Sequence, residues 1–336
     1  MGRRWLQIAL GAFLLGLLLW RTRVWELGDT LREFSVGTGI VVVLLNLPLI
    51  AILAFRTRLV LRRLGYDAST LSLIPISAVG NVAAVVTPGA TGDIIRAPFL
   101  KGRHAVSYSD GFATIVYERA YSFCILCLST ALVAAWNVAP VPLRIAIPFV
   151  WLPVLALPMA AARPLVSLGA WAGRAPTTMF WGLRPLVRTL NLGEGRWIQA
   201  LATLMRDLRL SLFFAGLTIT IFATMAFQLW LIADSMAVSL TAGEASVAIG
   251  ASVVAGIVSF LPLGLGVLDW TLAALLEKAG ATVASGAAVV VLYRATITLP
   301  AGLLGVAAYA YLVAKLRRMP GEPSSEGAAA RASDTT

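Results

Sequence analysis

The sequence has few charged side chains and very few of the residues that usually bind metals. Only 13% of its 336 residues are charged and 59% are hydrophobic, whereas a soluble domain has about 25% charged and 45–50% apolar residues. So few polar side chains cannot cover a surface that faces water, and we therefore expect the chain to face lipid. The only histidine is His104. The only cysteines, Cys124 and Cys127, lie in an apolar run, which favours two small helix residues over a redox or metal pair. We expect no metal and no cofactor.

The chain is nevertheless basic, with a formal net charge of +11. In a soluble protein such a charge would suggest a nucleic-acid partner. Here the basic residues lie between apolar runs, as they do in the cytoplasmic loops of membrane proteins. We therefore expect no nucleic-acid partner, and we predict a multi-pass protein of a cell (inner) membrane.

Long apolar runs predict the fold class, because about 20 apolar residues are needed for a helix to cross a bilayer. Six stretches are long enough or nearly so: residues 5–20, 39–55, 111–136, 143–162, 210–232 and 285–312. Together they predict an all-α polytopic membrane protein with about six full transmembrane helices.

Two further apolar regions, 71–100 and 245–279, are interrupted in their middles by proline and glycine. Each is too short on either side of its break for two crossings, so we predict two re-entrant broken-helix hairpins. The residues expected to break the helices are Pro88, Gly89, Gly92, Pro262, Gly264 and Gly266.

The basic residues favour one orientation. If the N-terminus is cytoplasmic and both hairpins return to their own side, 20 of the 27 lysines and arginines face the cytoplasm and five face outward. The remaining two, Arg119 and Arg294, then lie within the membrane. We therefore expect both termini in the cytoplasm. This count places Arg56 in the cytoplasmic loop that also contains Arg63.

The expected organisation is a single transmembrane domain over residues 1–318, followed by a disordered low-complexity tail over 319–336. Its two repeat halves would cover about 39–162 and 210–312. The arginine- and tryptophan-rich segment 163–209 between them predicts an amphipathic stretch attracted to the anionic lipids of the cytoplasmic leaflet. A partner-binding loop is the alternative.

The two halves resemble each other weakly. VVTPGATGD around Pro88 resembles SFLPLGLGVLD around Pro262, and IVYERAYSF around Tyr117 resembles VVLYRATIT around Tyr293, at almost the same offset. In the expected topology the corresponding helices run in opposite directions, which predicts an inverted repeat. Inverted repeats with interrupted helices are typical of transporters, whose sites lie near the bilayer midplane where exposed backbone lines a polar cavity.

Charged residues inside the predicted membrane segments are the candidate substrate-binding residues. They are Asp93, Arg96, Glu118, Arg119, Asp269 and Arg294. Each would cost about 2.5–3.5 kcal/mol at a lipid-facing helix centre, so we expect them to face inward. Asp93 and Arg96 share a helix face, and Asp269 is the expected partner of Arg294. Two interpretations stay open: ion pairs that lock the halves together, or a polar path for a zwitterionic or anionic head group.

Four motifs resemble one known family. PGATGD-xx-R at 88–96, YER at 117–119, LPLGLGVLDW at 261–270 and LYR at 292–294 resemble the lysylphosphatidylglycerol synthase transmembrane-region family. This family includes the flippase half of the multiple peptide resistance factor. The resemblance covers most of the chain. It implies a membrane protein that translocates or binds phospholipids or polyprenyl-linked sugars. We expect no soluble aminoacyl-transferase domain.

The sequence departs from that family's pattern at both breaks. The first family motif tends toward Pro-Gly-basic-x-Gly-Glu and the last toward Leu-Pro-Gly-Gly-Leu-Gly-x-Arg-Glu. Here Ala90 and Leu268 replace the basic residues, Leu263 replaces a glycine, and Asp93 and Asp269 replace the glutamates. Acidic character is kept while two basic positions are lost, so we expect a lipid other than aminoacylated phosphatidylglycerol.

The leading hypothesis is a lipid flippase-like protein that is not an enzyme. The sequence contains no Walker-type phosphate loop, so any energy would come from a gradient, from mass action or from a partner. Arg119 and Arg294 would meet the phosphate, and the acidic residues would meet an amine or hydroxyl. One alternative is an accessory membrane subunit of a separate lipid-modifying enzyme. The other is a membrane transferase acting on lipid-linked substrates.

Overall fold

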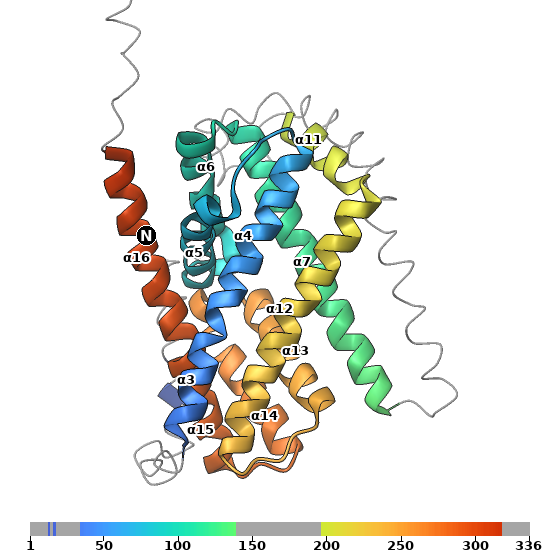
Figure 1. The fold of residues 1–336 in the computed structure, drawn as a ribbon. Coiled ribbons are helices and arrows are strands. Elements are labelled where there is room, and N and C mark those ends of the chain that lie inside the picture. Colours follow the sequence, from blue (N-terminus) through green and yellow to red (C-terminus); the bar gives the residue numbers. More distant parts are fainter. Residues whose placement is uncertain (1–12, 14–15, 18–33, 139–195, 318–336) are drawn as a thin grey trace, which may run out of the picture.

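The computed structural model describes residues 34–138 and 196–317, together with positions 13, 16 and 17. These two long stretches are helical and contain no strand, which confirms the all-α class (Figure 1). The predicted membrane segment 143–162, and 5–20 apart from positions 13, 16 and 17, lie outside the described residues. The same holds for the tail 319–336 and for most of segment 163–209.

The first described stretch consists of two long helical rods with a broken hairpin between them. Ser69 begins the hairpin as an N-cap, because its side chain accepts a hydrogen bond from the Ser72 N–H. Pro88 lacks an N–H and opens the break. The elements are α3 (Val36–Leu44), α4 (Asn46–Arg63), α5 (Thr70–Val86), the 3-10 segment η2 (Pro88–Ile95), α6 (Arg96–His104) and α7 (Tyr108–Val138).

The second described stretch follows a similar order of elements. Thr241 caps its hairpin through a capping box with Glu244, and Pro262 opens its break. The elements are α11 (Arg196–Met205), α12 (Leu208–Ser235), α13 (Ala242–Val258), the 3-10 turn η6 (Pro262–Gly264), α14 (Val267–Lys278), α15 (Val283–Tyr293), the π-turn η7 (Arg294–Thr298) and α16 (Leu299–Arg317).

The described residues contain four helices long and apolar enough to cross a membrane. They are Val36–Arg63, Tyr108–Val138, Leu208–Ser235 and Val283–Lys315. Each contains one of the predicted stretches 39–55, 111–136, 210–232 and 285–312. The shorter apolar helices α5 and α13 fall in the two regions predicted to be broken.

The two hairpins start from opposite ends of the molecule (Figure 1). α5 follows the end of α4 and leads through η2 into α6, which lies beside that same end. α13 begins at the other end and leads through η6 into α14, which returns to where α15 starts. Each hairpin therefore returns to the end of the molecule from which it starts.

The second hairpin turns in left-handed backbone conformations. Gly264 and Gly266 have φ values of 58° and 79°, and Leu263 between Pro262 and Gly264 has a φ of 59°. Glycine adopts positive φ freely, whereas a side chain such as that of Leu263 is strained there by about 1–2 kcal/mol. This strained residue directs its carbonyl at the Arg294 guanidinium.

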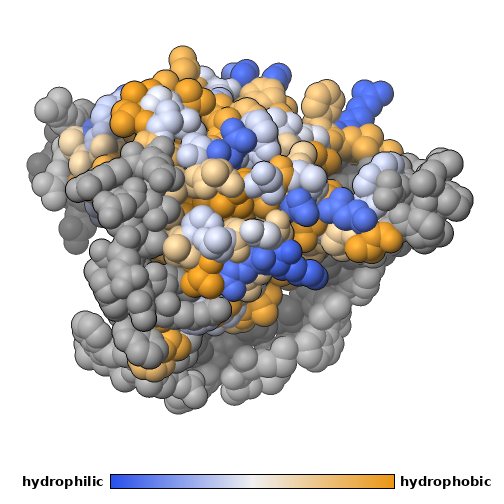
Figure 2. Space-filling view, turned by 90° about the horizontal axis from the view of Figure 1, so that it is seen from below, coloured by the Kyte–Doolittle hydropathy of each residue, from blue (hydrophilic) through white to orange (hydrophobic). Residues whose placement is uncertain are grey.

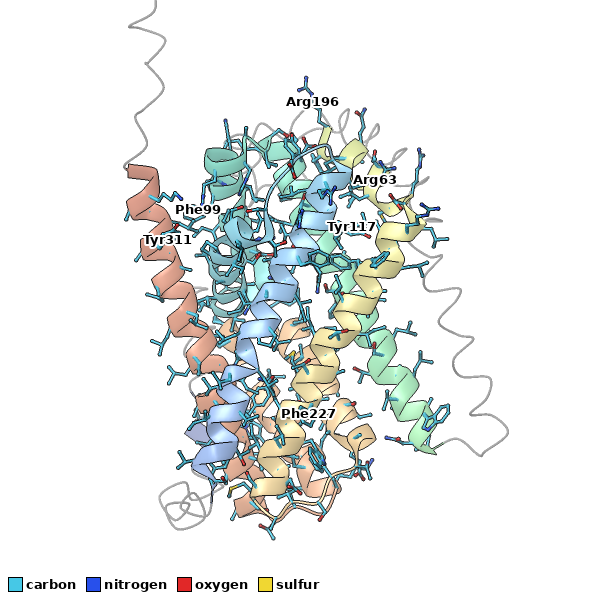
Figure 3. The ribbon with its side chains drawn as sticks, in the orientation of Figure 1. Arg63, Phe99, Tyr117, Arg196, Phe227 and Tyr311 are labelled. Carbon is cyan, nitrogen blue, oxygen red and sulfur yellow. The ribbon has the colours of Figure 1, made fainter. Side chains whose placement is uncertain are left out.

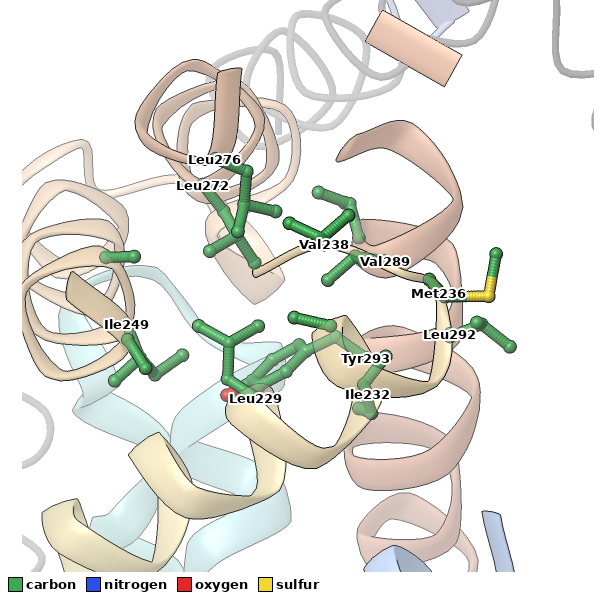
Figure 4. Packing of buried hydrophobic residues seen from close by; sticks show 14 of the residues in the cluster. Leu229, Ile232, Met236, Val238, Ile249, Leu272, Leu276, Val289, Leu292 and Tyr293 are labelled. Carbon is green, nitrogen blue, oxygen red and sulfur yellow. The ribbon is translucent and has the colours of Figure 1, made fainter. Parts of the chain in front are cut away.

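Packing between the helices relies on apolar side chains and on close backbone approach. The largest cluster of buried residues joins α12, α13, α14 and α15 and includes Leu229, Ile249, Leu272 and Tyr293 (Figure 4). α13 approaches α7 so closely at Gly250 that an added Cβ would overlap the Thr130 side chain. Small residues at such crossings are typical of helices that pack within a membrane.

The outside of the bundle suits a bilayer. Many large apolar side chains are exposed along the long helices, among them Phe213, Leu303 and Val306. Viewed from the end where α14 and α15 meet, hydrophilic side chains appear among the hydrophobic ones (Figure 2). Apolar sides and a more polar end are what a protein crossing the membrane requires.

Candidate functional site

A cavity of about 580 Å³ lies between the two described stretches. Its lining comes from α4, α5, α6 and α7 of the first stretch and from α12, α13, η6, α14, α15, η7 and α16 of the second. Both helix breaks border it, at Thr87 and at Gly264. The polar lining residues include Asn81, Ser122, Thr298 and five charged side chains: Arg56, Arg96, Glu118, Arg119 and Arg294.

Arg96, the first residue of α6, is the centre of a buried polar network. Its side chain is only 4% exposed. Nη1 donates to Glu118 at 2.6 Å and to Asp93 at 3.3 Å, and Nη2 donates to the Thr57 hydroxyl at 2.5 Å. The sequence predicted that Asp93 and Arg96 share a helix face, and the structure pairs them three residues apart. The network thus ties η2, α6, α7 and α4 together.

Arg119 connects the same network to the cavity. Its Nε donates to the Asp93 carboxylate at 2.8 Å, while 41% of its side chain stays exposed. The adjacent residue Glu118 contacts Arg96 instead. The two neighbours on α7 pair with other segments, because adjacent residues on a helix point about 100° apart. No hydrogen bond from the terminal nitrogens of Arg119 to a described residue occurs.

Gly80 on α5 makes room for the pair Asp93–Arg96. A Cβ at this position would overlap the Asp93 carboxylate and the Arg96 side-chain methylenes. The absence of a side chain therefore lets α5 pack directly over two buried charged residues. Close packing of this kind excludes water and strengthens the ion pair, provided that the charges remain matched.

The topology count from the sequence was wrong about Arg56. We expected it in a cytoplasmic loop, but it lies within α4 and is only 5% exposed. Its Nη2 donates to Ser122 of α7 at 2.5 Å, and its guanidinium carbon sits 4.0 Å from the centre of the Phe214 ring. α4 continues for about two further turns before it ends at Arg63, which places Arg56 inside the bundle.

The second stretch carries a simpler charged pair. Arg294 donates from Nε and Nη2 to the two oxygens of Asp269, at 2.8 and 3.1 Å, and from Nη1 to the Leu263 carbonyl at 3.1 Å. Asp269 is fully buried and also accepts the Gly266 N–H at 3.0 Å. The expected Asp269–Arg294 pair is therefore present, in the two-pronged geometry that suits arginine and carboxylate.

Arg294 begins the π-turn η7, an irregularity that recurs at functional sites in helices. Asn46 on α4 reaches across to this turn and donates to the Thr296 carbonyl at 3.2 Å. The same amide also donates to two carbonyls of α3. The contact joins the first stretch to the second at the edge of the cavity, where both residues are buried.

The six predicted site residues thus form two groups beside one cavity. Asp93, Arg96, Glu118 and Arg119 form one network. Asp269 and Arg294 form the other pair.

With this geometry in place, comparison with known proteins identifies the family. Residues 4–305 match the family described as Lysylphosphatidylglycerol synthase TM region. The chain belongs to this family. No curated protein matches the sequence significantly. Membership confirms the resemblance of the four motifs and shows a membrane protein linked to lipid modification.

In this member of the family, three polar residues join the expected ones. Arg56, Thr57 and Ser122 bind within the network or line the cavity. The sequence FRTRL at 55–59 resembles the basic end of a membrane helix, so reading the pattern alone assigned it to a loop. The burial of Arg56 could have been predicted had the end of α4 been placed at Arg63, two helical turns after Arg56.

Proposed function

We propose that the chain is a lipid flippase-like protein of the cell inner membrane, which binds a phospholipid or a polyprenyl-phosphate-linked lipid and translocates it between leaflets. One observation carries the proposal: a cavity at two helix breaks is lined by four arginines and one glutamate. Charged residues inside a membrane bundle usually mark a substrate path. The acyl chains would stay in lipid while the head group crosses through the cavity.

The arrangement of the two pairs supports an inverted repeat around this cavity. Arg119 reaches Asp93 through Nε at 2.8 Å, and Arg294 reaches Asp269 through Nε at the same distance. The hairpins that carry the aspartates start from opposite ends of the bundle (Figure 1). Two similar halves of opposite direction can open in turn toward the two leaflets, with the site fixed between them.

Basic side chains support the cytoplasmic assignment of one end. Arg63 and Arg196 lie at the end formed by α4, α6 and α11 (Figure 3). Under the positive-inside rule this end faces the cytoplasm. The C-terminal end of α16, at Arg317, lies on the same side of the molecule and therefore faces the cytoplasm too.

The test is lipid translocation in proteoliposomes that contain the purified full chain. Phosphatidylglycerol and polyprenyl-phosphate probes labelled on the apolar chain are followed while a membrane-impermeant reductant quenches the outer leaflet. The wild-type protein is expected to expose the inner-leaflet probe. Arg119→Gln removes a charge-assisted hydrogen bond of about 1.5–3 kcal/mol, so its rate should fall about tenfold to a hundredfold.

The matched control is Arg62→Gln, because Arg62 is exposed in the last turn of α4 and is not a lining residue of the cavity. It should translocate at the wild-type rate. Equal rates for Arg119→Gln and the wild type, with both proteins folded, would refute the head-group path. Absence of translocation by wild-type protein, with or without a proton gradient, would favour an accessory subunit of a lipid-modifying enzyme.

A further inference from the structure

The carboxylates beside the cavity are already engaged by arginines. Asp93 accepts from Arg96 and Arg119, and Asp269 accepts from Arg294. Both aspartates are fully buried and neither lines the cavity. Among the described residues, Glu118 is the single lining carboxylate, and it accepts from Arg96 at 2.6 Å.

The arginines, in contrast, outnumber the carboxylates. The first network holds the guanidinium groups of Arg56, Arg96 and Arg119 against the carboxylates of Asp93 and Glu118. This leaves one positive charge in excess. The pair Asp269–Arg294 adds none. A net positive charge inside the membrane is costly unless an anion accompanies it.

Arg56 carries this excess. It is nineteen-twentieths buried and lines the cavity, and no described carboxylate forms an ion pair with it. Its contacts are the neutral Ser122 hydroxyl and the face of the Phe214 ring. Its Nε has no hydrogen-bond partner. Ser122 lies three residues after Arg119 on the same face of α7, so Arg56 and Arg119 approach the cavity side by side.

We propose that the cavity binds one phosphate-ester anion between Arg56 and Arg119, and that it discriminates against head groups carrying an ammonium group. The proposal rests on the proposed function, for which it specifies the substrate class. A phosphate oxygen accepts the unused guanidinium donors and neutralises the excess charge. An ammonium would meet that excess charge, and each nearby carboxylate already contacts an arginine. The second oxygens of Asp93 and Glu118 have no hydrogen-bond partner but are buried. Aminoacylated phospholipids are therefore excluded as preferred substrates.

Equilibrium binding to the detergent-solubilised full chain tests the proposal independently of transport. The fluorescent probes are phosphatidylglycerol, lysylphosphatidylglycerol, phosphatidylethanolamine, diacylglycerol and a polyprenyl phosphate, each labelled on its apolar chain. Phosphatidylglycerol and the polyprenyl phosphate should bind at least about tenfold more tightly than the other three. Diacylglycerol lacks the phosphate, and each charge-assisted hydrogen bond contributes about a tenfold factor or more. Lysylphosphatidylglycerol and phosphatidylethanolamine keep the phosphate but carry an ammonium that meets the excess positive charge. Inorganic phosphate should displace them weakly, because it lacks the apolar chains.

Variants of α4 test the role assigned to Arg56. Arg56→Gln should weaken phosphatidylglycerol binding about tenfold or more and reduce the preference over lysylphosphatidylglycerol, whereas Arg56→Lys should keep most of the preference. Arg62→Gln, on the same helix but exposed, should match the wild type. If Arg56→Gln fails to fold, the head-group series on the wild-type protein decides.

The proposal is overturned if lysylphosphatidylglycerol binds as tightly as phosphatidylglycerol, or if folded Arg56→Gln keeps the full preference. Inorganic phosphate that competes as well as the lipids would identify a free anion as the ligand and overturn the lipid assignment. Selective binding without translocation would refute the transport function alone. Translocation that ignores the head group would refute only the selectivity.

Discussion

Arg294 and Asp269 form a buried ion pair whose strength can be measured by a double-mutant cycle. Arg294→Met keeps an unbranched apolar stem and removes the charge. Asp269→Asn also removes a charge but keeps an oxygen for the Gly266 N–H, which the carboxylate accepts at 3.0 Å. Each single variant leaves one charge buried without its partner, which costs about 3–5 kcal/mol of unfolding free energy. The double variant leaves no unpaired charge, so it should lose far less than the sum.

Arg63 and Asp207 provide a matched control within the same protein. Their side chains form a contact of 2.5 Å, but they are 49% and 21% exposed, whereas the buried pair is 21% and 0% exposed. An exposed pair contributes about 0–1 kcal/mol. The same cycle with Arg63→Met and Asp207→Asn should therefore give a coupling energy about 2–4 kcal/mol smaller than the buried cycle.

Both cycles can be measured by reversible unfolding in mixed micelles with increasing fractions of denaturing detergent. The reasoning is refuted if the coupling energy of Asp269 with Arg294 is no larger than that of Arg63 with Asp207. Such a result would mean that solvent screens the pair Asp269–Arg294, and that this pair does not lie in the interior of the bundle.

Three further outcomes follow from single positions. Gly80→Ala should destabilise the protein, because the new Cβ overlaps the Asp93 carboxylate. Gly216→Ala has open space around it and should raise helix stability by up to about 1 kcal/mol. Thermal unfolding in detergent compares the two variants. Thr241→Ala should cost about 1 kcal/mol in that assay by removing the capping box. The hydrogen bond from the Leu210 N–H lowers the pKa of Asp207. The stability that the Asp207 carboxylate contributes should therefore be complete above the ordinary aspartate pKa and disappear as the pH falls through the lowered pKa. Asp207→Asn should not show this loss of stability in acid.

Much of the helical framework could be predicted from the sequence because lipid imposes a strong constraint on it. A helix is the one way for a single apolar segment to satisfy its backbone within a bilayer. The stretches 39–55, 111–136, 210–232 and 285–312 therefore predicted long helices. Proline followed by glycines, at Pro88 and Pro262, located the breaks for the equally local reason that proline removes a donor.

The sequence predicted only part of the pairing between the charged residues. Helix spacing placed Asp93 and Arg96 on one face, and Asp269 was the expected partner of Arg294. The pairing of Arg96 with Glu118 depends on how α6 packs against α7, which no local pattern encodes. Arg56 was misplaced because hydropathy marks where an apolar run ends, and α4 continues beyond that point to Arg63.

The most direct test of the central claim is the rate at which the unmodified full chain moves labelled phosphatidylglycerol across the bilayer of proteoliposomes, compared with protein-free liposomes of the same lipid composition. Nearly all of the inner-leaflet probe should become accessible to the impermeant reductant in protein-containing vesicles, whereas the inner-leaflet probe of protein-free ones should stay protected. Equal protection in both preparations, with the protein folded and inserted, would contradict the claim.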